Sequence, residues 1–205
     1  MAKQYIWRRL AMVKIGFIVE GDCEKILIES AGFQEWAKQQ NIEICKPIIN
    51  AKGNGNLLPS HIDVFVEQIS RTNPTVIVIL TDLEDAASPE TVKARIGTTH
   101  TNFVFIAIKA LEAWFLADSQ ALKNWLKTSH IEAYPENTQG LPWDRVKEIA
   151  KQYERRGPGS KVTFAKHMVT KNSFSIARAA AHGACSSAKA FHDTLIELGQ
   201  NSIQR

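Results

Sequence analysis

The sequence has few cysteines and no long apolar run. Its three cysteines are odd in number and form no CxxC pair, a pattern typical of reduced thiols and not of a disulfide framework. The apolar runs reach only about six residues, whereas a membrane-spanning helix needs roughly 20. We therefore expect no transmembrane segment and no membrane partner.

The start of the chain also lacks the pattern of a secretory signal. Three basic residues precede an apolar stretch, but Lys14 interrupts this stretch, and Glu20 follows in place of a small-residue cleavage site. We therefore expect a cytoplasmic protein. Met12 directly precedes the first apolar segment, so we interpret residues 1–11 as an N-terminal extension.

Short apolar runs in the first half of the chain predict an α/β fold. Most are almost continuously apolar, as in parallel strands that are covered on both faces, and segments with helical periodicity lie between them. This alternation predicts a Rossmann-like, mainly parallel four-stranded sheet flanked by helices. The expected strands are 13–19, 42–49, 75–80 and 103–108, and the expected intervening helices are 22–39, 57–71 and 89–96.

The second half of the chain has helical patterns and no further strand pattern. We expect an α/β domain over residues 12–130 and a helical C-terminal extension, residues 131–205, that packs on it. The expected helical stretches are 110–127, as one or two helices, 143–155, 161–181 and 184–198.

Acidic residues follow three of the four expected strands. Glu20 follows the first, Asp82 and Glu84 follow the third, and Glu112 follows the fourth. The carboxyl ends of parallel strands meet at one edge of a sheet, where ligands bind. If the chain stays extended after Leu80, Asp82 and Glu84 point to the same side. Paired carboxylates of this kind predict a Mg²⁺ (or Mn²⁺) site, with Asp82 and Glu84 as metal ligands and Glu20 as a further ligand or general acid/base.

Other acids near the first and third strands have structural interpretations. Asp22 is placed to be the N-cap of the helix that follows the first strand, and Glu24 is placed to interact with the dipole of that helix. Asp85 is expected to be solvated or to cap the next short helix. We therefore assign none of these three residues to the site.

Two of the acidic motifs resemble those of the TOPRIM domain. This metal-binding α/β unit occurs in topoisomerases, primases, recombination proteins and OLD-type nucleases. Its Glu after the first strand matches Glu20 in "VEGDCEK", and the first Asp of its DxD motif matches Asp82 in "LTDLED". Glu84 departs from the motif as Glu in place of Asp. The resemblance covers about residues 12–130.

A longer motif is similar to a small stand-alone bacterial TOPRIM-like family of unknown function. That family has a Glu-Ala-Trp-x-Leu-Ala-Asp segment after its fourth strand and an aromatic helix near its C-terminus. The segments "LEAWFLAD" (111–118) and "CSSAKAFHDTLIEL" (185–198) match both features. The resemblance implies that Glu112 belongs to the site and leaves Asp118 as either a ligand or a helix N-cap.

Positive charge is concentrated in one part of the chain. The net charge is +4, and residues 144–171 alone contain eight Lys or Arg and three acids. Such a stretch fits contact with the phosphates of a nucleic acid, and a solvated helix face is the alternative. The residues that we expect to bind nucleic acid are Lys52, Lys151, Arg155, Arg156 and Lys161.

Two classes of function follow from these patterns. The first is a Mg²⁺-dependent nuclease, with Asp82 and Glu84 on the metal and Glu20 and Glu112 as catalytic residues, serving phage defence or DNA repair. The alternative is a non-catalytic TOPRIM module that binds nucleic acid or a partner and acts with a separate ATPase. A receiver-like phosphoacceptor is a minor third class, because "EGD" replaces the acid pair that receivers need after strand one.

Overall fold

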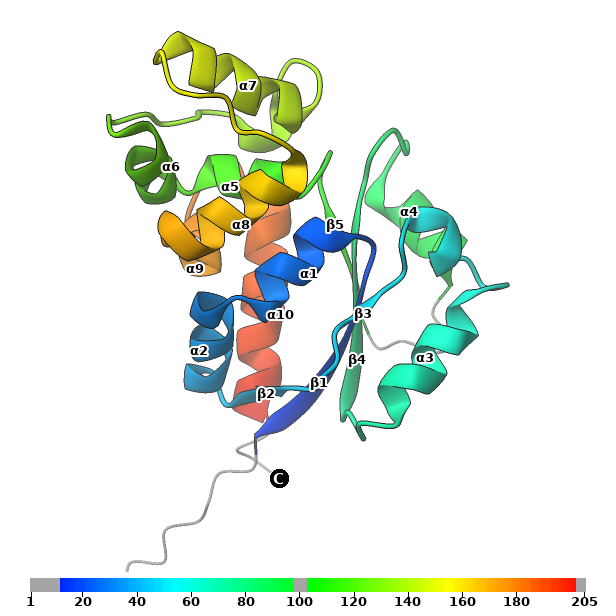
Figure 1. Cartoon of the computed structure of the whole chain (residues 1–205). Helices are drawn as coiled ribbons and strands as arrows, with labels where there is room; N and C mark the ends of the chain where they lie inside the picture. Colours follow the sequence, from blue (N-terminus) through cyan, green and yellow to red (C-terminus); the bar gives the residue numbers. More distant parts are fainter. Residues whose placement is uncertain (1–11, 98–102, 202–205) are drawn as a thin grey trace, which may run out of the picture.

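The structure is a computed structural model that describes residues 12–97 and 103–201. It has a central sheet with helices on both faces (Figure 1). The expected N-terminal extension, residues 1–11, lies outside the described residues. The α/β fold predicted from the sequence is confirmed.

The sheet is parallel and has five strands within the described residues. Its order is β2–β1–β4–β5, and the short strand β3 also pairs with β1. The strands are β1 (Val13–Val19), β2 (Ile42–Ile44), β3 (Ile49–Asn50), β4 (Val76–Asp82) and β5 (Phe103–Ala107). The two long central strands, β1 and β4, are buried along most of their length, as their continuous apolar sequences predicted.

The single strand expected over residues 42–49 is replaced by two short strands. β2 pairs with the start of β1, with Ile42 opposite Val13, and β3 pairs with its end, with Ile49 opposite Ile18. Pro47 lies between the two strands and has no backbone N–H for a ladder hydrogen bond. The prediction of four strands was therefore one strand short.

Two helical layers cover the sheet. Helices α3 and α4 pack on one face, where Ile18 of β1 meets Ile69 of α3 and Val92 of α4 in one apolar cluster. Helices α1, α2 and α10 cover the other face (Figure 1). The helices are α1 (Asp22–Glu29), α2 (Ala31–Gln39), α3 (Ile62–Ser70), α4 (Pro89–Ile96), α5 (Glu112–Ala117), α6 (Ser119–Leu126), α7 (Pro142–Gln152), α8 (Lys161–Lys171), α9 (Ile176–Ala180) and α10 (Ser186–Asn201), with short 3₁₀ helices at Asn54–Leu57 and Pro135–Asn137.

Several expected helices are divided by capping residues. The segment 22–39 forms two helices because Ser30 ends α1 and caps α2, accepting a hydrogen bond from the Phe33 amide at 3.3 Å. The segment 161–181 is likewise divided, and Ser175 is the N-cap of α9. Capping serines inside a long periodic pattern were the signal for these breaks.

The C-terminal segment supplies part of the main hydrophobic core. Phe191 of α10 is fully buried, and its ring centre lies 5.1 Å from that of Phe105 on β5 and 5.2 Å from that of Trp114 on α5. The rings of Phe17 and Phe33 lie 6.4 and 6.0 Å away. Residues 131–201 therefore contribute to the same core as the sheet, and α10 forms one of its covering helices.

Within residues 12–97 and 103–201, no helix combines the length and the apolar character that crossing a membrane requires.

Candidate functional site

Four acidic side chains approach one another at the carboxyl edge of the sheet. They come from different elements: Glu20 follows β1, Glu24 lies in α1, Asp82 ends β4, and Glu112 begins α5. Burial is the largest cause that raises the pKa of both Glu24 and Asp82. Repulsion from Glu20 and Glu112 raises the pKa of Glu24 further, and repulsion from the other three acids raises the pKa of Asp82 further. We call these four residues the carboxylate cluster.

Glu20 connects β1 to β4. Its backbone amide donates to the carbonyl of Leu80 at 3.0 Å. Its side-chain Oε2 accepts hydrogen bonds from the Thr81 hydroxyl and, at 3.1 Å, from the Asp82 amide. These contacts hold Glu20 beside Asp82, as the sequence predicted from the ends of parallel strands.

Glu24 is buried in the cluster, with 4% of its surface exposed. Its Oε2 accepts a 3.0 Å hydrogen bond from the Gly21 amide at the start of α1. Burial, reinforced by Glu20 and Glu112, raises the pKa of Glu24 to about 7. The structural role expected in the first turn is therefore present, and the structure also places Glu24 near Glu20 and Glu112.

Asp82 is held by the chain that follows β5. Its Oδ1 accepts a 2.9 Å hydrogen bond from the Leu111 amide. Burial, followed by the charges of Glu24, Glu112 and Glu20, raises the pKa of Asp82 well above its ordinary value. The second oxygens of Asp82 and Glu20 accept no hydrogen bond from the described residues. Each side chain is thus fixed through one oxygen and keeps the other available to a ligand.

Lys161 brings a positive charge to the cluster from the first turn of α8. Its Nζ lies 3.4 Å from both side-chain oxygens of Glu112. Burial opposes the charge of Lys161, but Glu112 and Asp82 outweigh it, and the pKa of Lys161 is raised. The Lys161 ammonium therefore offsets only part of the negative charge of the cluster when its four carboxyl groups are ionised.

Replacing Lys161 by methionine, which keeps an apolar stem, should leave the buried Glu112 without its ion pair. Because the Lys161 side chain is 44% exposed, we expect a loss of only about 1 kcal/mol in the free energy of unfolding at pH 8. Urea denaturation measures it. The control is Lys166→Met on the same helix, an exposed position with no ion pair among the described residues. Equal losses in the two variants would contradict a specific role for the Lys161–Glu112 pair.

Cys23 borders the cluster but is not suited to act as a nucleophile. Burial, followed by the charges of Glu24 and Glu112, raises the pKa of its thiol to about 12. The thiol is therefore protonated at neutral pH. Cys23 is therefore an ordinary residue of α1.

Glu84 lies outside the carboxylate cluster. The extended chain ends at Asp82, and Glu84 adopts a left-handed backbone conformation with φ of 50°. Its exposed side chain accepts a hydrogen bond from Asn54. The assumption that period two continues to Glu84 was therefore wrong, and the structure does not bring Glu84 to the other acids.

Asp22 and Lys52 form an exposed pair at the same edge of the sheet. Gly21, and not Asp22, is the N-cap of α1, so that expectation was wrong. Asp22 Oδ1 instead accepts hydrogen bonds from Lys52 Nζ at 3.0 Å and from Asn50 Nδ2 at 2.7 Å. Lys52 was expected to bind nucleic acid, but its charge is shared with Asp22.

Asp118 is a helix N-cap, one of its two expected roles. Its Oδ1 accepts from the Ala121 amide at 3.1 Å, and its two oxygens accept from the Arg178 guanidinium at 2.8 and 2.9 Å. The Ser175 amide donates to it at 2.9 Å. Asp118 is fully buried by these partners, which fixes α6 to the start of α9.

The remaining expected nucleic-acid ligands are exposed. Lys151 lies near the end of α7, and Arg155 and Arg156 lie in the loop before α8. Their side chains make no hydrogen bond or ion pair with the described residues. Lys161 differs from them, because it points to Glu112.

The donor chemistry of the carboxylate cluster fits a hard cation. Carboxylate oxygens are the protein ligands that Mg²⁺ and Mn²⁺ prefer. In the part of the chain that the structure describes, however, no three His, Cys, Asp or Glu side chains are grouped so that they could hold a metal ion. The carboxylate cluster therefore has the ligand type that such a cation prefers, but its side chains are not arranged as a complete metal site.

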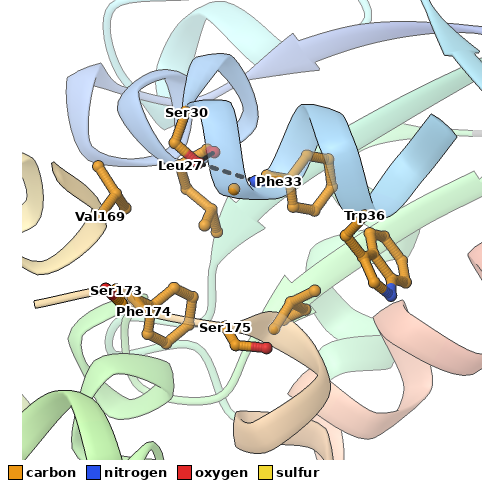
Figure 2. A pocket seen from close by; sticks show the side chains of 10 residues that line it. Leu27, Ser30, Phe33, Trp36, Val169, Ser173, Phe174 and Ser175 are labelled. Atoms are coloured by element: carbon orange, nitrogen blue, oxygen red, sulfur yellow. Dashed lines mark hydrogen bonds between the residues drawn. The ribbon is translucent and has the colours of Figure 1, made fainter. Parts of the chain in front are cut away.

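A cavity of about 370 Å³ lies apart from the carboxylate cluster (Figure 2). It opens between the end of α1, α2 and the segment between α8 and α9, with Leu27, Phe33, Trp36 and Phe174 in its lining. Its serine hydroxyls at positions 30 and 175 already cap helices. The cavity thus carries none of the acidic residues discussed above.

Comparisons of the chain with protein-family models, with curated proteins and with solved structures found no match.

Proposed function

We propose that the chain is a nuclease that hydrolyses phosphodiester bonds of nucleic acid with the help of Mg²⁺ or Mn²⁺. The observation that supports this most is the carboxylate cluster itself, in which the pKa of Glu24 is about 7 and that of Asp82 is raised. Acidic side chains with strongly shifted pKa values are concentrated at functional sites, where catalysis or binding requires such an arrangement. The TOPRIM-like motifs around Glu20 and Asp82 give the same assignment by resemblance.

The proposed roles follow from the side-chain contacts. Asp82 and Glu20 would hold the cation through the oxygens that accept no hydrogen bond from described residues. When bound, such a cation polarises a phosphoryl oxygen and lowers the pKa of bound water. Glu24, with a pKa of about 7, can take up or release a proton at neutral pH. Glu112 positions the Lys161 ammonium, which can bind a phosphate oxygen of the substrate.

Exposed cations supply the contacts expected for a nucleic-acid backbone. Lys151, Arg155 and Arg156 are unpaired within the described residues, and the loop that carries the two arginines leads to Lys161. A strand whose phosphate lies at the carboxylate cluster would therefore pass near them. Phosphate contacts of this kind supply most of nonspecific affinity.

A non-catalytic nucleic-acid or partner-binding module, acting with a separate ATPase, is the second candidate. It is favoured by the absence of a closed metal-ligand group among the described residues and by the Lys161 ammonium beside Glu112. Such a module would bind nucleic acid through the same exposed cations without cleaving it.

Incubation with plasmid DNA, single-stranded DNA and tRNA in Mg²⁺ or Mn²⁺ separates the two candidates. We expect cleavage by the wild-type chain, none after removal of the cation with EDTA, and strong loss in Glu20→Gln. The matched control is Asp85→Asn, an exposed acid near the same edge, which should cleave normally. Equal cleavage by all variants would indicate a contaminating nuclease, and binding without any cleavage would favour the module.

A further inference from the structure

We infer that a second cavity, of about 310 Å³, beside α8 receives one unpaired nucleotide of the bound strand. The cavity is lined by Trp125 of α6, by Arg156 with the loop 157–159, and by Thr163 and His167 of α8. The inference rests on the proposed nucleic-acid function and adds to it a preference for single-stranded substrate.

An aromatic ring in the lining supplies a stacking surface. Trp125 is half-buried, and its ring packs edge-on against Phe164 with ring centres 5.0 Å apart. The indole is therefore held by the core on one side while part of it borders the cavity. A fixed aromatic ring is the feature on which proteins stack unpaired bases, with little dependence on base identity.

The charge of the lining suits the phosphate of the same nucleotide. Arg156 is exposed and its guanidinium has no partner among the described residues. His167 Nε2 lies 3.3 Å from the Nζ of Lys171, which adds a second positive group nearby. Among the described residues, no acidic side chain lines the cavity. An aromatic ring beside an unpaired arginine is a combination that recognises a base and its phosphate together.

The size of the cavity limits what it can receive. Its volume of about 310 Å³ lies at the lower end of the range for small-molecule sites, about 300–1,000 Å³. This is room for a single base with part of its sugar, and not for a base pair within a duplex. If the bound strand is a nucleic acid, the part that fits the cavity is therefore an unstacked nucleotide.

The position of the cavity connects it to the carboxylate cluster. Lys161, which contacts Glu112, opens α8, and Thr163 and His167 lie further along the same helix. Successive helical residues turn by about 100°, so these two lie on a different side of α8 from Lys161. A strand that leaves the cluster would cross the start of α8, past Arg155 and Arg156, before a base enters the cavity.

Fluorescence anisotropy with a labelled single-stranded oligonucleotide and a matched hairpin duplex tests this inference. The full chain is measured in EDTA, so that binding is separated from cleavage. The variants are Trp125→Leu, which keeps an apolar side chain against Phe164, and Arg156→Gln at an exposed position. The control is Arg71→Gln, at an exposed arginine that is the C-cap of α3 and pairs with Glu67. Circular dichroism checks that each variant is folded.

We expect Trp125→Leu to weaken single-strand binding by roughly 5- to 150-fold, the range for loss of one stacked base, with little change for the duplex. Arg156→Gln should weaken strand binding and reduce its salt dependence, whereas Arg71→Gln should do neither. Unchanged strand affinity in both variants, or equal losses for strand and duplex in Trp125→Leu, would overturn the inference. A wild-type chain that binds strands in the expected pattern but cleaves nothing would contradict the nuclease function and still support the nucleotide cavity.

Discussion

The Asp82→Asn variant should resist urea better than the wild-type chain at pH 8 while losing nucleic-acid cleavage. Asparagine keeps an Oδ1 that can accept the Leu111 amide hydrogen bond but removes one negative charge from the carboxylate cluster. Because burial and the neighbouring acids disfavour the ionised form of Asp82 and raise its pKa, we expect a gain of about 0.5–2 kcal/mol, typical of a relieved unfavourable site. Cleavage should fall by at least about 100-fold.

The pH dependence of unfolding has a definite sign for this cluster. The pKa of Glu24 is raised from 4.5 to about 7 in the folded chain, so the folded state binds this proton more tightly than the unfolded state. The contribution is fully present below about pH 4.5 and is lost as the pH rises through about 7. Wild-type stability should therefore fall over this range, by up to about 3 kcal/mol from Glu24.

The control for Asp82→Asn is Asp85→Asn, which removes a charge from an exposed neighbouring position. It should change neither the urea midpoint at pH 8 nor cleavage. The expected result for Asp82→Asn is a gain in stability at pH 8. If it instead lowered the free energy of unfolding at pH 8, and by as much as it does at pH 5, the four acids would not repel one another as described. If it cleaved like wild type, Asp82 would have no part in catalysis.

The Phe191→Ala variant should lose about 3–5 kcal/mol in the free energy of unfolding, as for other large aromatic side chains removed from a core. Phe191 is fully buried, and its ring packs against Phe105 and Trp114 at centre distances of 5.1 and 5.2 Å. Removing it leaves a cavity between α10 and the sheet that rigid neighbours cannot fill. Denaturation followed by circular dichroism measures the loss.

This variant also tests whether residues 131–205 fold together with the sheet. Ile131→Ala, at a side chain that is 72% exposed, is the control and should cost less than about 0.5 kcal/mol. A single cooperative transition that shifts as a whole in Phe191→Ala is expected from the shared core. A second transition confined to the helical segment, with the sheet unaffected, would contradict it.

Local patterns in the sequence predicted most of the fold. Continuous apolar runs identified β1 and β4, and the helix expected over residues 89–96 has the bounds of α4, Pro89–Ile96. The boundaries that differ depend on single residues: Pro47 interrupts the pairing along β1, and Ser30 caps a new helix. Such breaks are readable in the sequence only when each capping or interrupting residue is weighed against the surrounding periodicity.

The candidate site was only partly predictable, because burial and long-range pairing decide its membership. Glu20, Asp82 and Glu112 follow from the rule that parallel strands end at one edge. Glu24 looked like a helix-dipole residue, and its burial is a result of tertiary packing, which includes the contact of α8 with α1. Lys161 is 49 residues from Glu112 in sequence. The basic stretch 144–171 therefore indicated that Lys161 contributes positive charge, but it could not predict the ion pair with Glu112.

The central claim is that the carboxylate cluster binds a divalent cation. Calorimetric titration with Mn²⁺ tests this claim most directly. Near pH 6.5, Glu24, with a pKa of about 7, carries a proton in most of the molecules. A bound cation must displace protons from ligands and their neighbours. The account predicts saturable binding by the wild-type chain with proton release, seen as a dependence of the heat on the buffer's ionisation enthalpy, and its loss in Asp82→Asn but not in Asp85→Asn. No binding, or equal binding by Asp82→Asn, would contradict the account.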